Sequence, residues 1–171
     1  MIATEYHPQF FTATILEWKK LLQPDKYKQT IIDSLKFLVN EQRVIVTAFV
    51  IMDNHLHIIW QTVNGFTPQQ VQHSFLRYTA QQIKFDLQEH DPAFLEEFRV
   101  DAADREYQFW ERNPLSIDLY SEKVFFQKLD YLHANPVVEG LCQYPEEYKY
   151  SSALFYEKEI DLFGFITHWR E

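Results

Sequence analysis

Residues 44–63 read VIVTAFVIMDNHLHIIWQTV, and this stretch predicts a buried β-hairpin. Its first half, residues 44–52, is rich in Val and Ile and has neither Gly nor Pro, which is typical of a strand buried on both faces. Asp53 and Asn54 are short polar residues that tolerate the backbone of a tight turn. We expect the hairpin in the middle of an antiparallel sheet, because so apolar a strand is poorly suited to an exposed edge.

The returning strand carries two histidines, His55 and His57, on one face. Successive side chains of a strand point to opposite faces, so residues two apart project in parallel. Two parallel imidazoles on a rigid strand can chelate a metal ion. The same spacing also occurs when histidines are ordinary core residues with satisfied hydrogen bonds, and the pattern alone leaves both interpretations open.

Length and composition predict a single domain covering residues 1–171. The one cysteine, Cys142, excludes an internal disulfide framework and a cysteine-rich zinc site. With no signal peptide and no apolar run long enough to span a membrane, we expect a cytoplasmic protein. The net charge of −9 argues against a protein that coats nucleic acid non-specifically. It leaves room for a DNA enzyme with a local basic groove.

Periodicity and start and stop residues predict the remaining elements. Tyr78, on the second predicted helix, is expected to be a core contact. Pro136 is expected to end the last helix, since the residue before a proline avoids the helical region. In chain order we expect a strand at 10–18, helices at 25–40 and 69–88, a helix or loop at 92–98, a short edge strand at 107–110 and a helix at 122–134. This order predicts an α+β fold, an antiparallel sheet with helices packed on it.

Tyr131 and Asn135 are four residues apart on the last predicted helix, so they share one face. The phenol could act as a nucleophile, and the amide oxygen could be a third metal ligand. Taken alone, they are also an ordinary half-buried tyrosine and an ordinary residue at a helix end. Tyr78 and Gln82 form a second pair with the same spacing.

The segments in combination resemble a known family. Residues 50–61, VIMDNHLHIIWQ, resemble the HUH strand of the single-tyrosine transposases, in which His-x-His binds a divalent metal. Residues 107–112 (YQFWER), 129–141 (LDYLHANPVVEGL) and 144–153 (YPEEYKYSSA) resemble the C-terminal half of the REP-associated tyrosine transposases. These segments occur in matching order over about residues 44–156. Asp53 departs from the family, which usually has proline there, and so does the net acidity.

The resemblance implies a ferredoxin-like antiparallel sheet of four to five strands and a metal-dependent DNA transposase. His55 and His57 would bind Mg²⁺ or Mn²⁺, with Asn135 at the position where the wider family has a glutamine ligand. Tyr131 would be the nucleophile that cleaves and rejoins single-stranded DNA through a 5′-phosphotyrosine. Tyr131 is preferred to Tyr78 because it lies inside the longer resemblance. His133, on a different face of that helix, is expected to be structural.

Single-stranded DNA and DNA hairpins are the implied partners. Trp110 and Tyr107 are candidates for stacking on bases. Candidates for phosphate contacts are Lys19, Lys20, Lys123, Lys128, Arg105 and Arg112. A homodimer is expected, although the REP-associated branch is also expected to include monomers. Two alternatives remain: a hairpin-binding protein without chemistry, and a metal-dependent hydrolase that uses water.

Overall fold

The computed structural model describes residues 2–171. The elements are β1 (Gln9–Thr14), η1 (Leu16–Trp18), α1 (Asp25–Asn40), β2 (Val44–Ile51), β3 (His55–Thr62), α2 (Pro68–His90), α3 (Pro92–Glu96), β4 (Arg99–Ala102), β5 (Arg105–Tyr107), β6 (Leu115–Asp118), α4 (Glu122–Val138), η2 (Pro145–Glu147) and α5 (Ala153–Lys158). Among residues 2–171, no helix combines the length and the apolar character that a membrane crossing requires.

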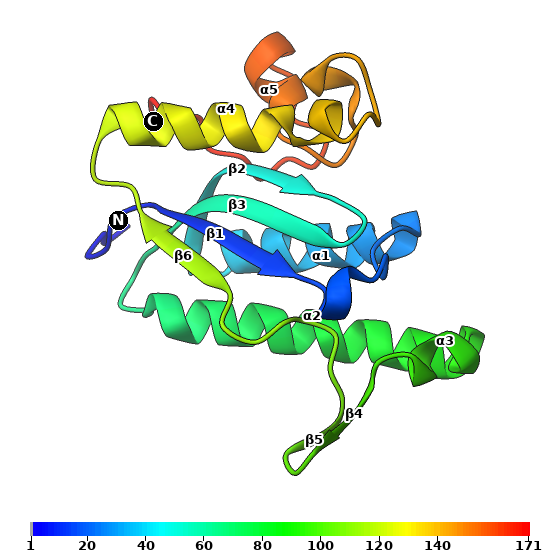
Figure 1. Cartoon of the computed structure of the whole chain (residues 1–171). Coiled ribbons are helices and arrows are strands. Elements are labelled where there is room, and N and C mark those ends of the chain that lie inside the picture. Colours follow the sequence, from blue (N-terminus) through cyan, green and yellow to red (C-terminus); the bar gives the residue numbers. More distant parts are fainter. Residues whose placement is uncertain (1) are drawn as a thin grey trace.

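Four strands form the central sheet in the order β2-β3-β1-β6, and every neighbouring pair is antiparallel. In Figure 1, α2 lies below this sheet, α1 lies behind it and α4 crosses above it. The predicted α+β class, a four-stranded antiparallel sheet covered by helices, is therefore confirmed.

The alternation predicted along β3 separates two hydrophobic clusters. Leu56, Ile58 and Trp60 belong to the cluster on the α1 and α2 side, where the Trp60 ring centroid lies 5.0 Å from that of Phe11. Ile59 belongs to the second cluster, which also contains Phe10 of β1 and the α4 residues Leu129 and Leu132. The odd-numbered residues of β3 therefore face α4.

The hairpin does not lie in the middle of the sheet, so that expectation was wrong. β3 is an inner strand, but β2 is the terminal strand. Its outer edge is instead covered by the C-terminal segment, which makes backbone hydrogen bonds from Ile51 N–H to Tyr150 C=O (2.9 Å), from Ser152 N–H to Phe49 C=O (2.9 Å) and from Thr167 N–H to Val46 C=O (2.9 Å). An apolar edge strand is tolerated here because later residues satisfy its backbone groups.

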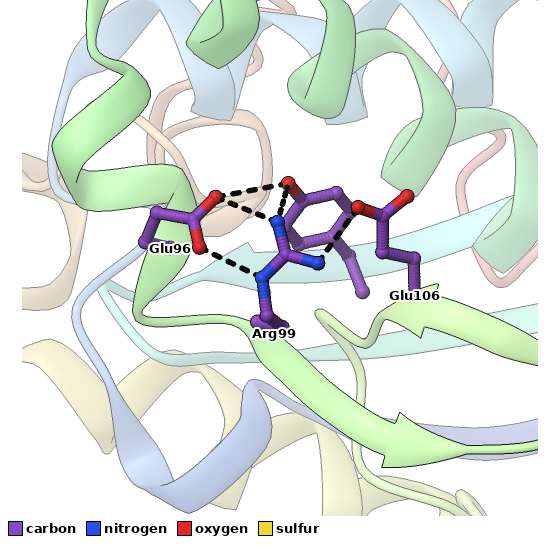
Figure 2. A network of polar contacts seen from close by, with 4 residues as sticks. Glu96, Arg99 and Glu106 are labelled. Atoms are coloured by element: carbon purple, nitrogen blue, oxygen red, sulfur yellow. Dashed lines mark hydrogen bonds and ion pairs between the residues drawn. The ribbon is translucent and has the colours of Figure 1, made fainter.

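The strand expected at 107–110 was also placed wrongly. The observed strand is β5, which pairs with β4 in a separate two-stranded arm rather than with the central sheet. Arg99 anchors this arm, as Figure 2 shows: its Nε lies 2.7 Å from Glu96 Oε2, and its Nη1 lies 2.7 Å from Glu106 Oε1. The fourth strand of the main sheet is β6, which the sequence pattern did not reveal.

Helix α4 passes through Pro136 and ends at Val138, contrary to the expected stop. Asn135 and Pro136 are both buried against the sheet, and this packing outweighs the local preference of the residue before proline. Two residues beyond Val138, Gly140 has φ of +78°, a left-handed conformation that glycine adopts without strain and that is common just after a helix. Asn135 therefore stays on the helix, one turn after Tyr131.

Asp86 links the two helices on the lower face. Its Oδ2 accepts a hydrogen bond from the Tyr27 hydroxyl (2.6 Å) and lies 2.7 Å from Lys26 Nζ. Lys26 first, and the Tyr27 hydroxyl second, lower the pKa of the Asp86 carboxyl below its ordinary value. Since α2 contributes Asp86 and α1 both partners, this contact favours the packing of α1 against α2 only while the carboxyl is ionised.

Candidate active site

His55 and His57 are buried on the α4 side of β3, with 6% and 5% of their surface exposed, and their ring centroids are 5.1 Å apart. Each ring is oriented through its Nδ1. His57 Nδ1 lies 2.8 Å from Oγ1 of Thr12, the residue directly opposite on β1. His55 Nδ1 lies 2.8 Å from Oδ1 of Asn54 in the turn. Partners of this kind fix the ring orientation in metal sites.

His57 Nε2 is a buried nitrogen that finds no hydrogen-bond partner among residues 2–171. Buried polar atoms are normally satisfied, so an unpartnered nitrogen here is a candidate position for ligand binding. Burial lowers the pKa of His57 to about 3, with smaller contributions from His55 and Lys128, and burial also lowers the pKa of His55. Both rings are therefore neutral at neutral pH, which is the form that binds metal ions.

Helix α4 brings Tyr131 and Asn135 to the histidines. The Tyr131 ring centroid lies 5.4 Å from that of His57, and 54% of the Tyr131 side-chain surface remains exposed. Asn135 is buried, and the charge of Glu139 first and the Asn135 side chain second partly offset the lowering effect of burial on the pKa of His55. The structure thus brings together His55, His57, Tyr131 and Asn135, the four residues singled out from the sequence.

The donor set fits a weakly held divalent ion. Residues 2–171 contain no group of three or more His, Cys, Asp and Glu side chains placed to hold a metal. A third protein ligand beside the two imidazoles would therefore be the Asn135 amide oxygen, a donor that hard cations accept. The negative charge of Glu139, one helical turn beyond Asn135, acts on the same His55 ring.

Of the six candidate cations, Lys128 reaches the site. Its Nζ lies 5.7 Å from the ring centroid of Tyr131 and 5.1 Å from that of Phe10. Arg105 and Arg112 instead line a groove of about 710 Å³ on the α2 side of the molecule. Lys19 is directed to the backbone carbonyl of Glu97. Lys20 and Lys123 are exposed residues with no contact to the site that the structure records.

The stacking candidates need correction. Trp110 is 7% exposed, and its Nε1–H donates to Thr79 Oγ1 (3.2 Å), so its ring is a core residue with no face free for a base. Tyr107 belongs to the Arg99 network of the two-stranded arm, where its hydroxyl accepts from Arg99 Nη2 (2.9 Å). The aromatic residue at the site is Trp18, which the sequence pattern had placed in a strand; its ring centroid is 5.8 Å from that of His55.

The second tyrosine pair lies on the other side of the sheet. Tyr78 is 50% exposed, so its expected role as a core contact was wrong. Its helix, α2, packs on the face opposite α4, and the sheet separates it from the histidine rings (Figure 1). Tyr78 and Gln82 are therefore not brought to His55 and His57.

His133 is structural, as expected. Its Nε2 lies 2.7 Å from Ser152 Oγ, and burial lowers the pKa of the ring to about 4. Ser152 also bonds the backbone of Phe49, so this contact ties α4 to the segment that covers the edge of β2.

An ion pair holds the turn of Asp53 and Asn54, directly before the histidines. Asp53 Oδ1 lies 2.8 Å from Lys28 Nζ, which also donates to the carbonyl oxygens of Leu22 (2.8 Å) and Gln23 (3.1 Å). The backbone adds bonds from Leu22 N–H to Asp53 C=O and from Ile15 N–H to Asn54 C=O, each 2.8 Å. The turn is thus fixed by contacts rather than by a proline ring.

No protein-family model and no curated protein matches the sequence. Among solved structures, a REP-associated tyrosine transposase bound to a REP hairpin superposes with a TM-score of 0.65. The alignment covers 94% of this chain and 86% of that chain, at 15% sequence identity. This chain has the fold of the REP-associated tyrosine transposase.

A second solved chain, described as a transposase from Deinococcus radiodurans R1, has a TM-score of 0.41 at 15% identity and covers 80% of this chain and 92% of its own length. It adds nothing to the fold assignment. The transposase fold explains why β3 and α4, which are distant in sequence, are adjacent: the strand order places β3 beside β1, and the chain returns over them after β6.

Proposed function

We propose that this protein is a metal-dependent transposase and single-strand endonuclease that cleaves and rejoins single-stranded DNA through a tyrosine. The observation that carries the proposal is the unpartnered Nε2 of His57, buried beside a half-exposed tyrosine ring on the opposing helix. If Tyr131 were only a packing residue, the histidine beside it would not need a buried nitrogen without a hydrogen-bond partner. The transposase fold supports the same reaction class.

In this proposal His55, His57 and Asn135 would hold Mg²⁺ or Mn²⁺, and the bound ion would supply Lewis-acid chemistry that neutralises charge on the scissile phosphate. Thr12 and Asn54 keep both imidazoles in the ligating orientation through their Nδ1 atoms. The neutral state of the rings, a consequence of burial, keeps them available at neutral pH.

Tyr131 supplies the nucleophile. Its phenolic oxygen forms a bond to phosphorus while the bond from phosphorus to the 3′-oxygen breaks. The phenolic proton is released, and the departing 3′-oxygen takes up a proton to become a hydroxyl. Lys128, whose ammonium lies beside the Tyr131 ring, stabilises the negative charge that develops on the phenol and the phosphate. Because the phosphodiester energy is kept in the phosphotyrosine, rejoining to another 3′-hydroxyl needs no ATP.

The proposed substrate is single-stranded DNA next to a hairpin, by analogy with the hairpin bound to the solved REP-associated transposase. Both the histidines and Tyr131 come from one chain. This supports cleavage within a single subunit, while the expected homodimer stays a prediction about assembly.

Covalent capture tests the proposal. The probe is a pool of synthetic hairpins with randomised single-stranded flanks, labelled at the 3′ end and incubated with the protein and Mn²⁺. Attack that leaves a 5′-phosphotyrosine transfers the 3′ label to the protein, whereas a 5′ label leaves as a free fragment. We expect Tyr131→Phe to abolish the adduct. The matched variant Tyr78→Phe, which removes a hydroxyl from the other tyrosine pair, should retain it.

Each other outcome has a distinct meaning. An adduct lost in Tyr78→Phe and kept in Tyr131→Phe would move the nucleophile to α2 and withdraw Asn135 as a ligand. Hairpin binding without any adduct would favour the alternative of a DNA-binding protein without chemistry. Cleavage that leaves both fragments free of protein would favour a hydrolase that uses water.

A further inference from the structure

Two consecutive residues of the 3₁₀ helix η1 adopt left-handed backbone conformations. Glu17 has φ of 55° and Trp18 has φ of 58°, and neither is a glycine. Such conformations are unfavourable for residues with a β-carbon, and they persist where the surroundings impose them. Strained residues of this kind concentrate at ligand sites. The strain here directs one side chain, that of Trp18.

Three contacts impose the conformation. The Glu17 N–H donates to Oε1 of Glu111 (2.7 Å), and the Trp18 N–H donates to the carbonyl of Ile15 (2.9 Å). The Asn54 side-chain amide donates to the Trp18 carbonyl (3.3 Å). The Oδ1 of the same Asn54 side chain is the partner of His55 Nδ1. One side chain thus fixes both the histidine ring and the backbone that carries Trp18.

The outcome is an indole ring held in solvent at the edge of the site. Trp18 is 61% exposed, whereas Trp60 and Trp110 are buried and Trp169 is half-buried. Its ring meets the His55 ring edge-on, at an interplanar angle of 66°. Burying an indole ring stabilises a fold, and leaving it in solvent gives up that stabilisation. A strained backbone that keeps the ring exposed therefore indicates that the ring contacts a ligand.

We propose that Trp18 is a stacking platform for an unpaired base of the DNA strand, at or next to the scissile phosphate at the histidine site. Base–aromatic stacking tolerates any base, because every base has a π-face. At 5.8 Å between its ring centroid and that of His55, Trp18 lies within the reach of one nucleotide. This inference rests on the proposed function, and it assigns the stacking role to a residue on η1 rather than to Trp110.

Binding measurements test it in a cleavage-silent Tyr131→Phe background. The probe is a fluorescein-labelled hairpin with a single-stranded flank that forms the adduct with the unsubstituted protein, and anisotropy gives the affinity in Mn²⁺. Trp18→Ala should weaken binding about tenfold or more, the usual effect of losing one stacked base. Trp18→Phe should recover most of it. The control Phe85→Ala removes a 50% exposed aromatic from α2, on the opposite face, and should leave affinity unchanged.

Abasic substitutions stepped along the flank separate stacking from a merely structural role. With Trp18 present, one position should show a loss of about tenfold, and in Trp18→Ala that position should show no further loss. Unchanged affinity in Trp18→Ala, or the same position-specific abasic loss with and without the indole, would overturn the inference while the proposed function stood. If the protein binds no single-stranded probe and forms no adduct, the proposed function fails and the inference fails with it.

Discussion

Asp53→Ala should destabilise the protein by about 2–3 kcal/mol, because it leaves the buried ammonium of Lys28 without its ion-pair partner. Removing one partner of a fully buried ion pair costs about 3–5 kcal/mol. The Lys28 side chain is 5% exposed, but that of Asp53 is 25% exposed, and two backbone carbonyl oxygens still accept from Lys28 Nζ after the substitution. The expected cost therefore lies below the range for a fully buried pair.

Urea unfolding followed by circular dichroism measures the effect, with Lys28→Met and the double variant completing a cycle. Lys28→Met should cost less, about 1–2 kcal/mol, because methionine keeps most of the volume and the Asp53 carboxylate returns to water. The double variant should resemble Lys28→Met, so the coupling energy should equal the cost of Asp53→Ala, about 2–3 kcal/mol. Asp53→Asn is the matched control, since it keeps the shape and an accepting oxygen.

The reasoning is refuted if Asp53→Ala costs less than about 0.5 kcal/mol, the level of an exposed ion pair. The turn would then depend on its backbone hydrogen bonds alone, and Lys28 would not substitute for the rigidity of a proline. A coupling energy near zero would lead to the same conclusion even if both single variants were destabilised.

Two further predictions concern the metal and the pH dependence. His55→Ala should fold, because His55 is the first residue of β3 and belongs to neither hydrophobic cluster, and it should lose Mn²⁺ binding measured by isothermal titration calorimetry. Unchanged affinity after replacing both His55 and His57 would refute the metal assignment. Asp86→Asn should lower the free energy of unfolding by about 1 kcal/mol at pH 7. Since the folded-state pKa of Asp86 is lowered, its contribution exists above the unfolded pKa of about 4 and is lost as the pH falls through the folded value. The difference between wild type and Asp86→Asn should therefore vanish in urea titrations near pH 2, and a constant difference would contradict the ion pair.

The sequence period alone predicted which residues share a face, because the direction of a side chain within a strand or helix depends only on that element. The alternation along β3 predicted that His55 and His57 share a face, and four-residue spacing predicted the same for Tyr131 and Asn135. The partners of both histidine Nδ1 atoms could also have been found. Asn54 is the adjacent residue, and Thr12 lies on the strand FFTAT, two residues from Phe10 and on its face.

Tertiary contacts decided what periodicity could not. The position of β2 at the end of the sheet depends on residues 150–167. These residues make backbone hydrogen bonds to the outer edge of β2 but form only isolated bridges, not a continuous strand. Residues 16–18 continue the apolar run of β1 and look like strand, but bonds to Glu111 and Asn54 turn them into η1. Trp18 was missed for this reason, since neither partner is near it in sequence.

The two tyrosine pairs show why spacing alone does not choose a nucleophile. Both pairs have an i, i+4 spacing, and both helices pack against the sheet. The alternation of side chains along β3 distinguishes them. The histidines lie on the same face of β3 as Ile59, whereas Trp60 lies on the opposite face and contacts Phe75 of α2. Once α2 is known to pack on Trp60, a helix on the opposite face must complete any site built on His55 and His57. After β6 the chain crosses to that face as α4, so the tyrosine that can reach the histidines is Tyr131 (Figure 1).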